Sequence, residues 1–224
     1  MSATALAAAG CGGTTAQGDR QDVDEPKGNF PVEVKSATFP VNQKLAQDTQ
    51  MKIVVRNAGD KTIPEIAVTV QCDDSKKPKK EQARLTAIGN GSFDRQIGGV
   101  GNADKNRPNF VVNTIPGAVR PNTNQKLDPL ERSTAYVNTY TLGKLAPNKE
   151  VTFQWSVTAV RAGQFRVCYQ VAAGLDHKAI ATREGGLPLV HEWDGNITNK
   201  APRTGIADDG KTITTFPDTT GTGQ

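Results

Sequence analysis

Two histidines, His177 and His191, are the side chains in this sequence best suited to general-base or metal chemistry near neutral pH. The sequence has no His-Glu-x-x-His segment, no Gly-x-Ser-x-Gly turn and no Cys-x-x-Cys pair. The glycine-rich segment 98–101 has neither a helix pattern nor a Lys-Ser/Thr pair after it, so it does not predict a phosphate loop. We therefore predict that the chain is not an enzyme and uses no cofactor or metal. An enzyme with an unrecognised site around His177 or His191 remains an alternative.

Charge gives no sign of a nucleic-acid partner. The formal net charge is only +4. The strongest basic run, residues 76–80, lies beside Asp73, Asp74 and Glu81, with no aromatic residue between the lysines to stack on a base. This pattern is typical of a solvated loop. The acidic pairs at 73–74 and 208–209 lack the spacing of a known calcium loop.

The first cysteine, Cys11, follows the apolar and small residues 6–10 (Leu-Ala-Ala-Ala-Gly). Small side chains before a single cysteine are what a signal peptidase needs. This segment resembles the lipobox of bacterial lipoproteins, which implies lipidation of Cys11, a membrane anchor and an extracytoplasmic location, lipid-anchored or secreted. The segment before Cys11 is short and has no Lys or Arg, so an alanine-rich end with an incidental thiol is the competing interpretation.

The other two cysteines, Cys72 and Cys168, are expected to form a disulfide in an oxidising compartment. Each belongs to a segment that alternates like a strand, but the alternation places Cys72 on an inward face and Cys168 on an outward face. A bulge or a strand end at Gln71 would turn Cys72 toward Cys168 and give a surface bridge between adjacent strands. Two free thiols are the alternative.

Alternating apolar residues predict the strands that position these groups. The clearest period-two pattern spans residues 151–158, with Trp155 directed inward, and a second spans 165–171. Residues 51–56 and 63–70 are expected to pair as a hairpin. The strand-like pattern that starts at Phe30 is expected to form an edge strand, because prolines 31 and 40 bracket its apolar residues 32–37. Strands with one apolar face each must pack as two sheets.

The predicted fold class is therefore all-β, an immunoglobulin-like antiparallel β-sandwich with a long central insertion and disordered termini. The sandwich is expected to span residues 30–184, with the insertion at about 73–145 and minor strands near 110–112 and 136–137. Residues 1–11 would be a truncated signal and lipobox, and 12–29 a flexible tether. Residues 185–224 would be a C-terminal extension, partly disordered, with one strand near 211–213.

Three segments support a family resemblance. Residues 54–60, 145–153 and 163–167 resemble the CARDB type of bacterial immunoglobulin-like domain, with its Asn-x-Gly turn, its Leu-x-Pro turn before a strand and its Gly-x-aromatic strand opening. The resemblance implies an extracytoplasmic sandwich with no shared catalytic site.

These observations favour a non-enzymatic cell-envelope lipoprotein that presents the surface of its sandwich to an envelope protein. The alternative is a carbohydrate-binding accessory module for cell-wall glycan, with Trp193 or Tyr136 as the stacking surface. Neither hypothesis requires a nucleic-acid partner.

Overall fold

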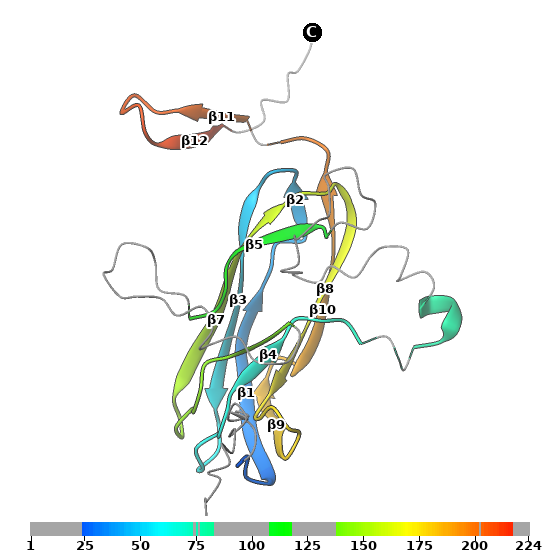
Figure 1. The fold of residues 1–224 in the computed structure, drawn as a ribbon, viewed down its shortest axis with the longest axis vertical. Coiled ribbons are helices and arrows are strands. Elements are labelled where there is room, and N and C mark those ends of the chain that lie inside the picture. The colour runs from blue at the N-terminus through cyan, green and yellow to red at the C-terminus, as the bar shows by residue number, and fades with distance from the viewer. Residues whose placement is uncertain are drawn as a thin grey trace, which may run out of the picture.

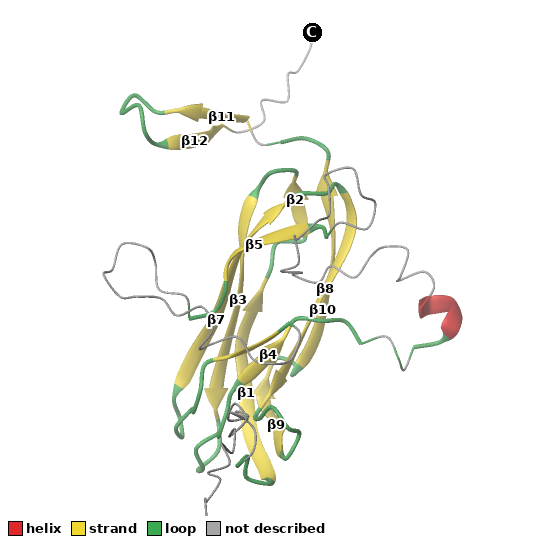
Figure 2. Ribbon diagram, viewed as in Figure 1, coloured by secondary structure: helices red, strands yellow, loops and turns green. Residues whose placement is uncertain are grey.

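A computed structural model describes residues 24–73, 75, 77–82, 108–117, 138–201 and 203–216. Within this part of the chain nearly all regular structure is strand, and one turn of helix at 79–82 is the exception (Figure 2). The all-β class expected from the sequence is confirmed. The tether before residue 24, most of the central insertion and the last eight residues lie outside the described residues, and so do the disordered ends predicted there.

The strands form two five-stranded sheets and a separate hairpin (Figure 1). The first sheet has the order β5-β7-β3-β1-β9, and the second has the order β2-β10-β8-β4-β6. The strands of the first sheet are β1 (Gly28–Thr38), β3 (Asp48–Asn57), β5 (Phe110–Thr114), β7 (Glu150–Ala159) and β9 (Ala179–Gly186). Those of the second are β2 (Asn42–Lys44), β4 (Ala67–Thr69), β6 (Thr139–Thr141), β8 (Gly163–Ala172) and β10 (Val190–Thr198). The hairpin joins β11 (Arg203–Ile206) to β12 (Ile213–Phe216).

The order of the central strands makes this an immunoglobulin-like sandwich. In immunoglobulin domains one sheet carries strands A, B, E and D, and the other carries C, F and G. Here β1, β3, β7 and β5 lie side by side in that first order, and β4, β8 and β10 in the second. The neighbouring pairs are antiparallel except β1 with β9 and β10 with β2, which are parallel pairings at sheet edges. The predicted antiparallel sandwich is confirmed, with these two parallel additions.

Alternation in the two longest predicted strands places the core between the sheets. The inward residues are Val151, Phe153, Trp155 and Val157 of β7 and Phe165, Val167, Tyr169 and Val171 of β8. All are buried except Val151, which is partly buried. The ring of Trp155 meets Tyr140 edge-on, with the centroids 5.4 Å apart, and stacks near Phe153 at 6.2 Å. These strands therefore hold the two sheets together as predicted.

Strand β1 is not the edge strand that its prolines suggested. It lies between β3 and β9. Proline has no backbone N–H to donate to a neighbouring strand. At Pro31 the missing N–H faces the turn after β3, where the strand has ended, and the Pro31 carbonyl accepts from Ala58 N at 3.0 Å. The regular pairing with β3 starts one residue later, at Val32 opposite Asn57. The edge prediction was wrong because a proline removes only one hydrogen bond between strands, which a central strand tolerates where its neighbour ends.

The predicted hairpin between residues 51–56 and 63–70 was also wrong, because β3 and β4 belong to different sheets. The connection crosses the end of the sandwich around Asn57, whose side chain is fully buried. Its Nδ2 donates to the carbonyls of Lys61 and Leu145, each at 2.8 Å. Its Oδ1 accepts from Gly59 N at 3.0 Å. The Asn-x-Gly segment therefore forms a turn as expected, but one that changes sheets.

The sandwich continues past residue 184, the boundary expected from the sequence. Strand β10 pairs with β8 over eight residue pairs, from Val190 opposite Gln170 to Ile197 opposite Gly163. Its apolar alternation was missed because Gly195 interrupts it. A Cβ on Gly195 would lie 2.3 Å from Phe165 Cζ, so the ring of the neighbouring strand fills that position. In the central insertion, β5 confirms the minor strand expected at 110–112, whereas residues 136–137 lie outside the described residues.

Candidate functional site

Cys72 and Cys168 form a disulfide, with their Cα atoms 4.9 Å apart and the residues 96 positions apart in the sequence. Strand β4 ends at Thr69, opposite Gln170 of β8. Cys72 therefore lies beyond the end of the strand, where side chains no longer alternate between the two faces. Its side chain can turn to the outer face, on which Cys168 lies. The expected pair is confirmed. It joins neighbouring segments of one sheet, whereas the disulfide of antibody domains joins the two sheets.

A charged cluster lies beside this disulfide on the outer face of the second sheet. The side chain of Arg166 on β8 is fully buried, and its Nη1 lies 3.4 Å from Oε2 of Glu192 on β10. Lys77 Nζ lies 3.2 Å from the same oxygen. The segment from Cys72 to Lys77 is therefore fixed to the sheet at both ends, by a covalent bond and by an ion pair. Sequence reasoning missed the cluster because residues 185–224 were expected to form an extension outside the sandwich, so no strand partner was expected there for this part of β8.

Trp193, a candidate stacking residue, belongs to the core. Its side chain is 9% exposed and its ring packs against Tyr169, with centroids 5.2 Å apart. His191 meets the same indole edge-on at 5.2 Å. Tyr169 is buried too; its hydroxyl donates to the carbonyl of Pro188 at 3.1 Å, and burial raises the pKa of Tyr169 to about 12. The Trp193 ring is therefore not available as a platform for a sugar.

Two other candidate residues, Cys11 and Tyr136, lie outside the described residues. Within the described ranges, no helix has the length and apolar character needed to cross a membrane. Nor do the described His, Cys, Asp and Glu residues form any group of three or more that is suited to hold a metal ion. His177 lies in the loop between β8 and β9 and His191 on β10, and both are exposed.

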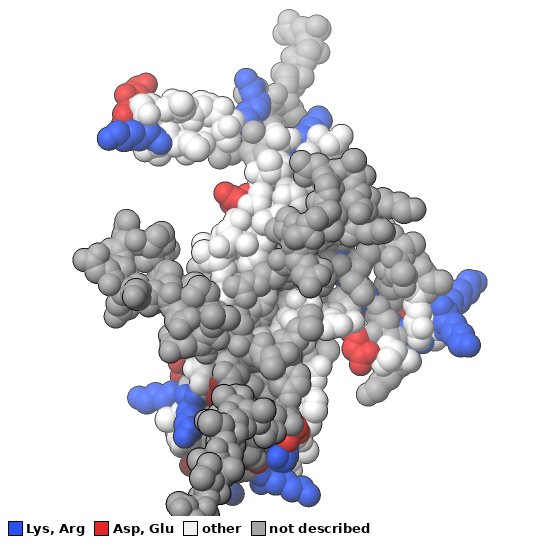
Figure 3. Space-filling model, in the orientation of Figure 1, with Lys and Arg blue, Asp and Glu red and all other residues white. Residues whose placement is uncertain are grey.

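Charged side chains of the first sheet pair across its outer face. Arg56 Nε lies 2.7 Å from Glu33 Oε2, and Lys35 Nζ lies 3.9 Å from carboxylate oxygens of both Glu33 and Glu150. Figure 3 likewise shows blue and red side chains close together at the end of the molecule where β1 begins. Paired surface charges of this kind contribute little stability and describe a solvated face.

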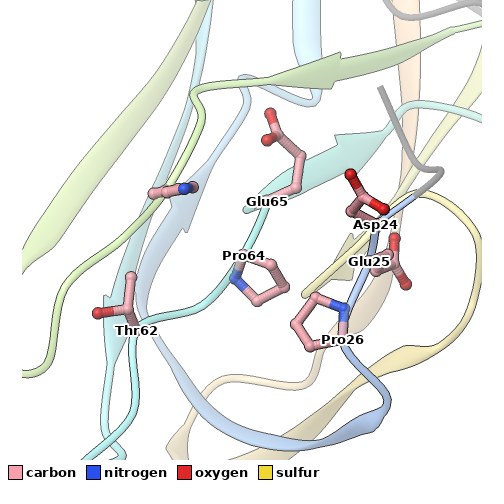
Figure 4. Close-up of a pocket in the computed structure, with 7 residues that line it drawn as sticks. Asp24, Glu25, Pro26, Thr62, Pro64 and Glu65 are labelled. Atoms are coloured by element: carbon pink, nitrogen blue, oxygen red, sulfur yellow. The ribbon is translucent and has the colours of Figure 1, made fainter. Parts of the chain in front are cut away.

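A pocket of about 400 Å³ opens where the chain enters the sandwich (Figure 4). Its walls come from the segment before β1, the connection from β3 to β4, and Lys144 before β7. Pro26 and Pro64 face each other across it, with the carboxylates of Asp24 and Glu65 near its rim. Its lining residues include three acidic residues and one lysine, and the carboxylates of Asp24 and Glu65 give it an acidic character. Sequence reasoning missed this pocket because residues 24–26 were assigned to a flexible tether.

Glu25, in the wall of this pocket, directs its carboxylate away from the cavity into the loop between β8 and β9. Oε2 accepts from the backbone N–H groups of Leu175 (2.5 Å) and Asp176 (2.8 Å). Oε1 accepts from those of Lys178 (2.8 Å) and Ala179 (2.7 Å). Burial raises the pKa of Glu25, but the four backbone hydrogen bonds outweigh it, so the pKa lies below its usual value. This carboxylate is therefore held in its charged form.

The β11–β12 hairpin carries three exposed apolar side chains, two of which are the most exposed large apolar residues of the described chain. Ile206 and Ile213 form a cross-strand pair and are 71% and 72% exposed, and Phe216 is 50% exposed. The ring of Phe216 covers Gly205, where a Cβ would lie 2.6 Å from Phe216 Cε2. The hairpin lies beyond the end of the sandwich opposite the start of β1 (Figure 1). Exposed apolar groups on a projecting element are typical of a contact surface.

Asp209, one of the acidic residues considered for calcium, instead closes the turn of this hairpin. Its Oδ1 accepts from the backbone of Lys211 at 2.9 Å and Thr212 at 2.8 Å, and its Oδ2 accepts from the Thr212 hydroxyl. Hydrogen bonds from the side chain and backbone of Thr212 and from the backbone of Lys211 lower the pKa of Asp209 to about 2. The carboxylate is thus used within the turn.

We expect the hairpin to open in acid. A carboxylate whose pKa is lowered on folding stabilises the folded form above its unfolded pKa and loses that contribution as pH falls through the folded pKa. Cross-strand NOEs between Ile206 and Ile213 should therefore persist from neutral pH down to about 4 and weaken between about 4 and 2. Asp209→Ala should weaken them already at pH 7, whereas Asp208→Ala should not. Equal behaviour of the two variants would contradict the assignment.

The comparisons with known proteins give likenesses of fold at low sequence identity. No protein-family model matches the chain, and no curated protein matches it by sequence. The fold is similar to part of Escherichia coli α2-macroglobulin, at 11% identity and a TM-score of 0.38, over 81% of this chain but only 21% of that one. It is similar to the CARDB domain of a Pyrococcus furiosus protein, determined in complex with di-metal ions, at 12% identity and a TM-score of 0.37, over 77% and 92% of the two chains. It is also similar to a PapD-like domain of human CEP192, at 11% identity and a TM-score of 0.35, over 90% and 99%.

Proposed function

We propose that this protein is a non-enzymatic interaction module of the cell envelope, anchored to the membrane by a lipid on Cys11, that presents its sandwich to another envelope protein. The observation that carries the proposal is the β11–β12 hairpin, with Ile206, Ile213 and Phe216 half or more exposed at the end away from the start of β1. These side chains do not contribute to the core of the sandwich, which is buried without them. They are suited to bury against an apolar patch on a partner.

Two further features support an extracytoplasmic setting. The Cys72–Cys168 disulfide is of the kind that persists in oxidising compartments. The small residues before Cys11 supply the cleavage-site part of the pattern that lipidation requires. The tether between Cys11 and residue 24 would then reach the sandwich at the end where β1 begins, which leaves the hairpin end directed away from the membrane.

The experiment separates the anchor from the contact. For the anchor, cells are labelled with an alkyne fatty acid; label is expected on the full chain and not on Cys11→Ser, and label on both or on neither would remove the lipid from the proposal. For the contact, a photo-crosslinking amino acid is placed at Ile213 in intact cells, with exposed Lys52 of β3 as the matched control. A discrete protein adduct is expected from position 213 only. Equal adducts from both positions, or none from 213, would overturn the contact.

The carbohydrate alternative is weaker than the sequence suggested, because the Trp193 ring is buried between Tyr169 and Phe39. Its remaining candidate, Tyr136, lies outside the described residues. The enzyme alternative has no support from the positions of His177 and His191, which lie on different elements and belong to no metal-binding group among the described residues.

A further inference from the structure

The loop from Gly174 to Ala179 has the geometry of a carboxylate-binding site. Four of its backbone N–H groups point at one carboxylate, two at each oxygen, with donor–acceptor distances from 2.5 to 2.8 Å. Convergent backbone donors of this kind form an anion-binding concavity that needs no cationic side chain. We call the backbone donors of Leu175, Asp176, Lys178 and Ala179 the cradle.

The sequence of the loop is fitted to this shape. A Cβ on Gly174 would lie 2.3 Å from Glu25 Cδ, so only glycine leaves room for the bound group. His177, between the two pairs of donors, has a positive φ of 58°, which turns the backbone so that the donors on either side converge. The ion pair between Lys178 Nζ and Asp176 Oδ2, at 2.8 Å, closes the loop on its outer side. The cradle is therefore built by the loop itself and not by Glu25.

The bound group comes from a segment that no strand holds. Glu25 precedes β1, whose pairing with β9 begins at Gly28, and Gly28 N donates to the Lys178 carbonyl at 3.0 Å. Residues 24–26 also form one wall of the 400 Å³ pocket. Anchoring Glu25 therefore fixes both the place where the N-terminal segment joins the sandwich and one wall of that pocket.

We propose that the cradle is a carboxylate-binding site that acts as a latch: in this structure it holds the chain's own Glu25, and once Glu25 is removed it binds a free carboxylate in its place. The ligand class follows from the donors, because four neutral N–H groups arranged in two pairs match the two oxygens of a carboxylate. The latch holds the N-terminal segment whether or not Cys11 carries a lipid.

The test uses the full chain and acetate as the probe. Glu25→Ala empties the cradle and Asp24→Ala, one residue away, is the matched control. In Glu25→Ala, acetate is expected to move the amide ¹H–¹⁵N resonances of the four cradle residues with half-saturation on the order of 10 mM, as suits so small a ligand. In the unaltered protein and in Asp24→Ala the same acetate should leave them in place. Trypsin should cut after Lys27 faster in Glu25→Ala, and acetate should not reverse that, because it cannot reconnect the segment.

A second variant decides whether acetate occupies the cradle or another surface. Adding Gly174→Ala to Glu25→Ala places a methyl group 2.3 Å from the position of the carboxyl carbon, too close for a bound carboxylate, so the acetate-dependent shifts should disappear. Gly174→Ala alone should expel Glu25 and speed cleavage after Lys27, which keeps the proposal testable if Glu25→Ala fails to fold. The proposal is overturned if acetate has no effect on Glu25→Ala, if the shifts survive in the double variant, or if cleavage after Lys27 is equally fast in all forms.

Discussion

Replacing Cys72 and Cys168 together with alanine is expected to lower the free energy of unfolding by about 4–5 kcal/mol. The disulfide closes a loop with a sequence separation of 96, and in the entropic account a loop of roughly 100 residues restricts the unfolded chain by about that amount. Because small domains are stable by only about 5–15 kcal/mol, the loss is a large share of the total. Guanidinium unfolding of the unaltered protein with its disulfide intact and of the double variant, followed by circular dichroism, measures the difference.

Two controls separate the covalent link from the contacts near it. Cys11→Ala removes a thiol without touching the pair and should leave the midpoint unchanged. Lys77→Ala removes the ion pair to Glu192 at the other end of the Cys72–Lys77 segment, and because that pair is partly exposed it should cost no more than about 1 kcal/mol. If the double cysteine variant were as stable as Cys11→Ala, the link would not contribute to stability in the way the loop length predicts.

The sequence predicted the parts of the fold in which side-chain pattern and burial agree. Residues 151–158 and 165–171 alternate without interruption, and they became β7 and β8 with the faces expected. The partners of a strand are less visible, because alternation reports a face and not a neighbour. Residues 51–56 and 63–70 are adjacent in sequence and both strand-like, yet the buried amide of Asn57 directs the chain from one sheet to the other.

The site was harder to predict for a related reason. Side-chain motifs identified Cys72 and Cys168, which are bonded. The cradle around Glu25 is made of backbone N–H groups, and its only sequence signal is Gly174, one of 22 glycines. Trp193 was considered as a platform because Gly195 hides the alternation of β10. An indole in a polar stretch looks exposed until the neighbouring strand is known.

Trp155→Ala is expected to cost about 3–5 kcal/mol, the range for removing a large aromatic side chain from a packed core. Trp155 is fully buried in β7, opposite Met51 of β3, and its ring contacts those of Tyr140 and Phe153. Tyr140 lies on β6 of the second sheet, so the indole bridges both layers of the sandwich. A methyl group in its place leaves a cavity between the sheets. Neither sheet can fill that cavity without shifting the pairing of its strands.

Ile213→Ala is the matched comparison, because it also removes a large apolar side chain but one that is 72% exposed on the hairpin. It should change the free energy of unfolding by no more than about 0.5 kcal/mol, while the Trp155→Ala midpoint should fall by roughly 6–20 °C in a thermal scan followed by circular dichroism. For binding the expected effect is reversed: Ile213→Ala should weaken the proposed partner contact although it leaves the sandwich intact. Comparable losses of stability in the two variants would mean that the core does not lie between the sheets at Trp155, and the division between a closed core and an exposed contact element would fail with it.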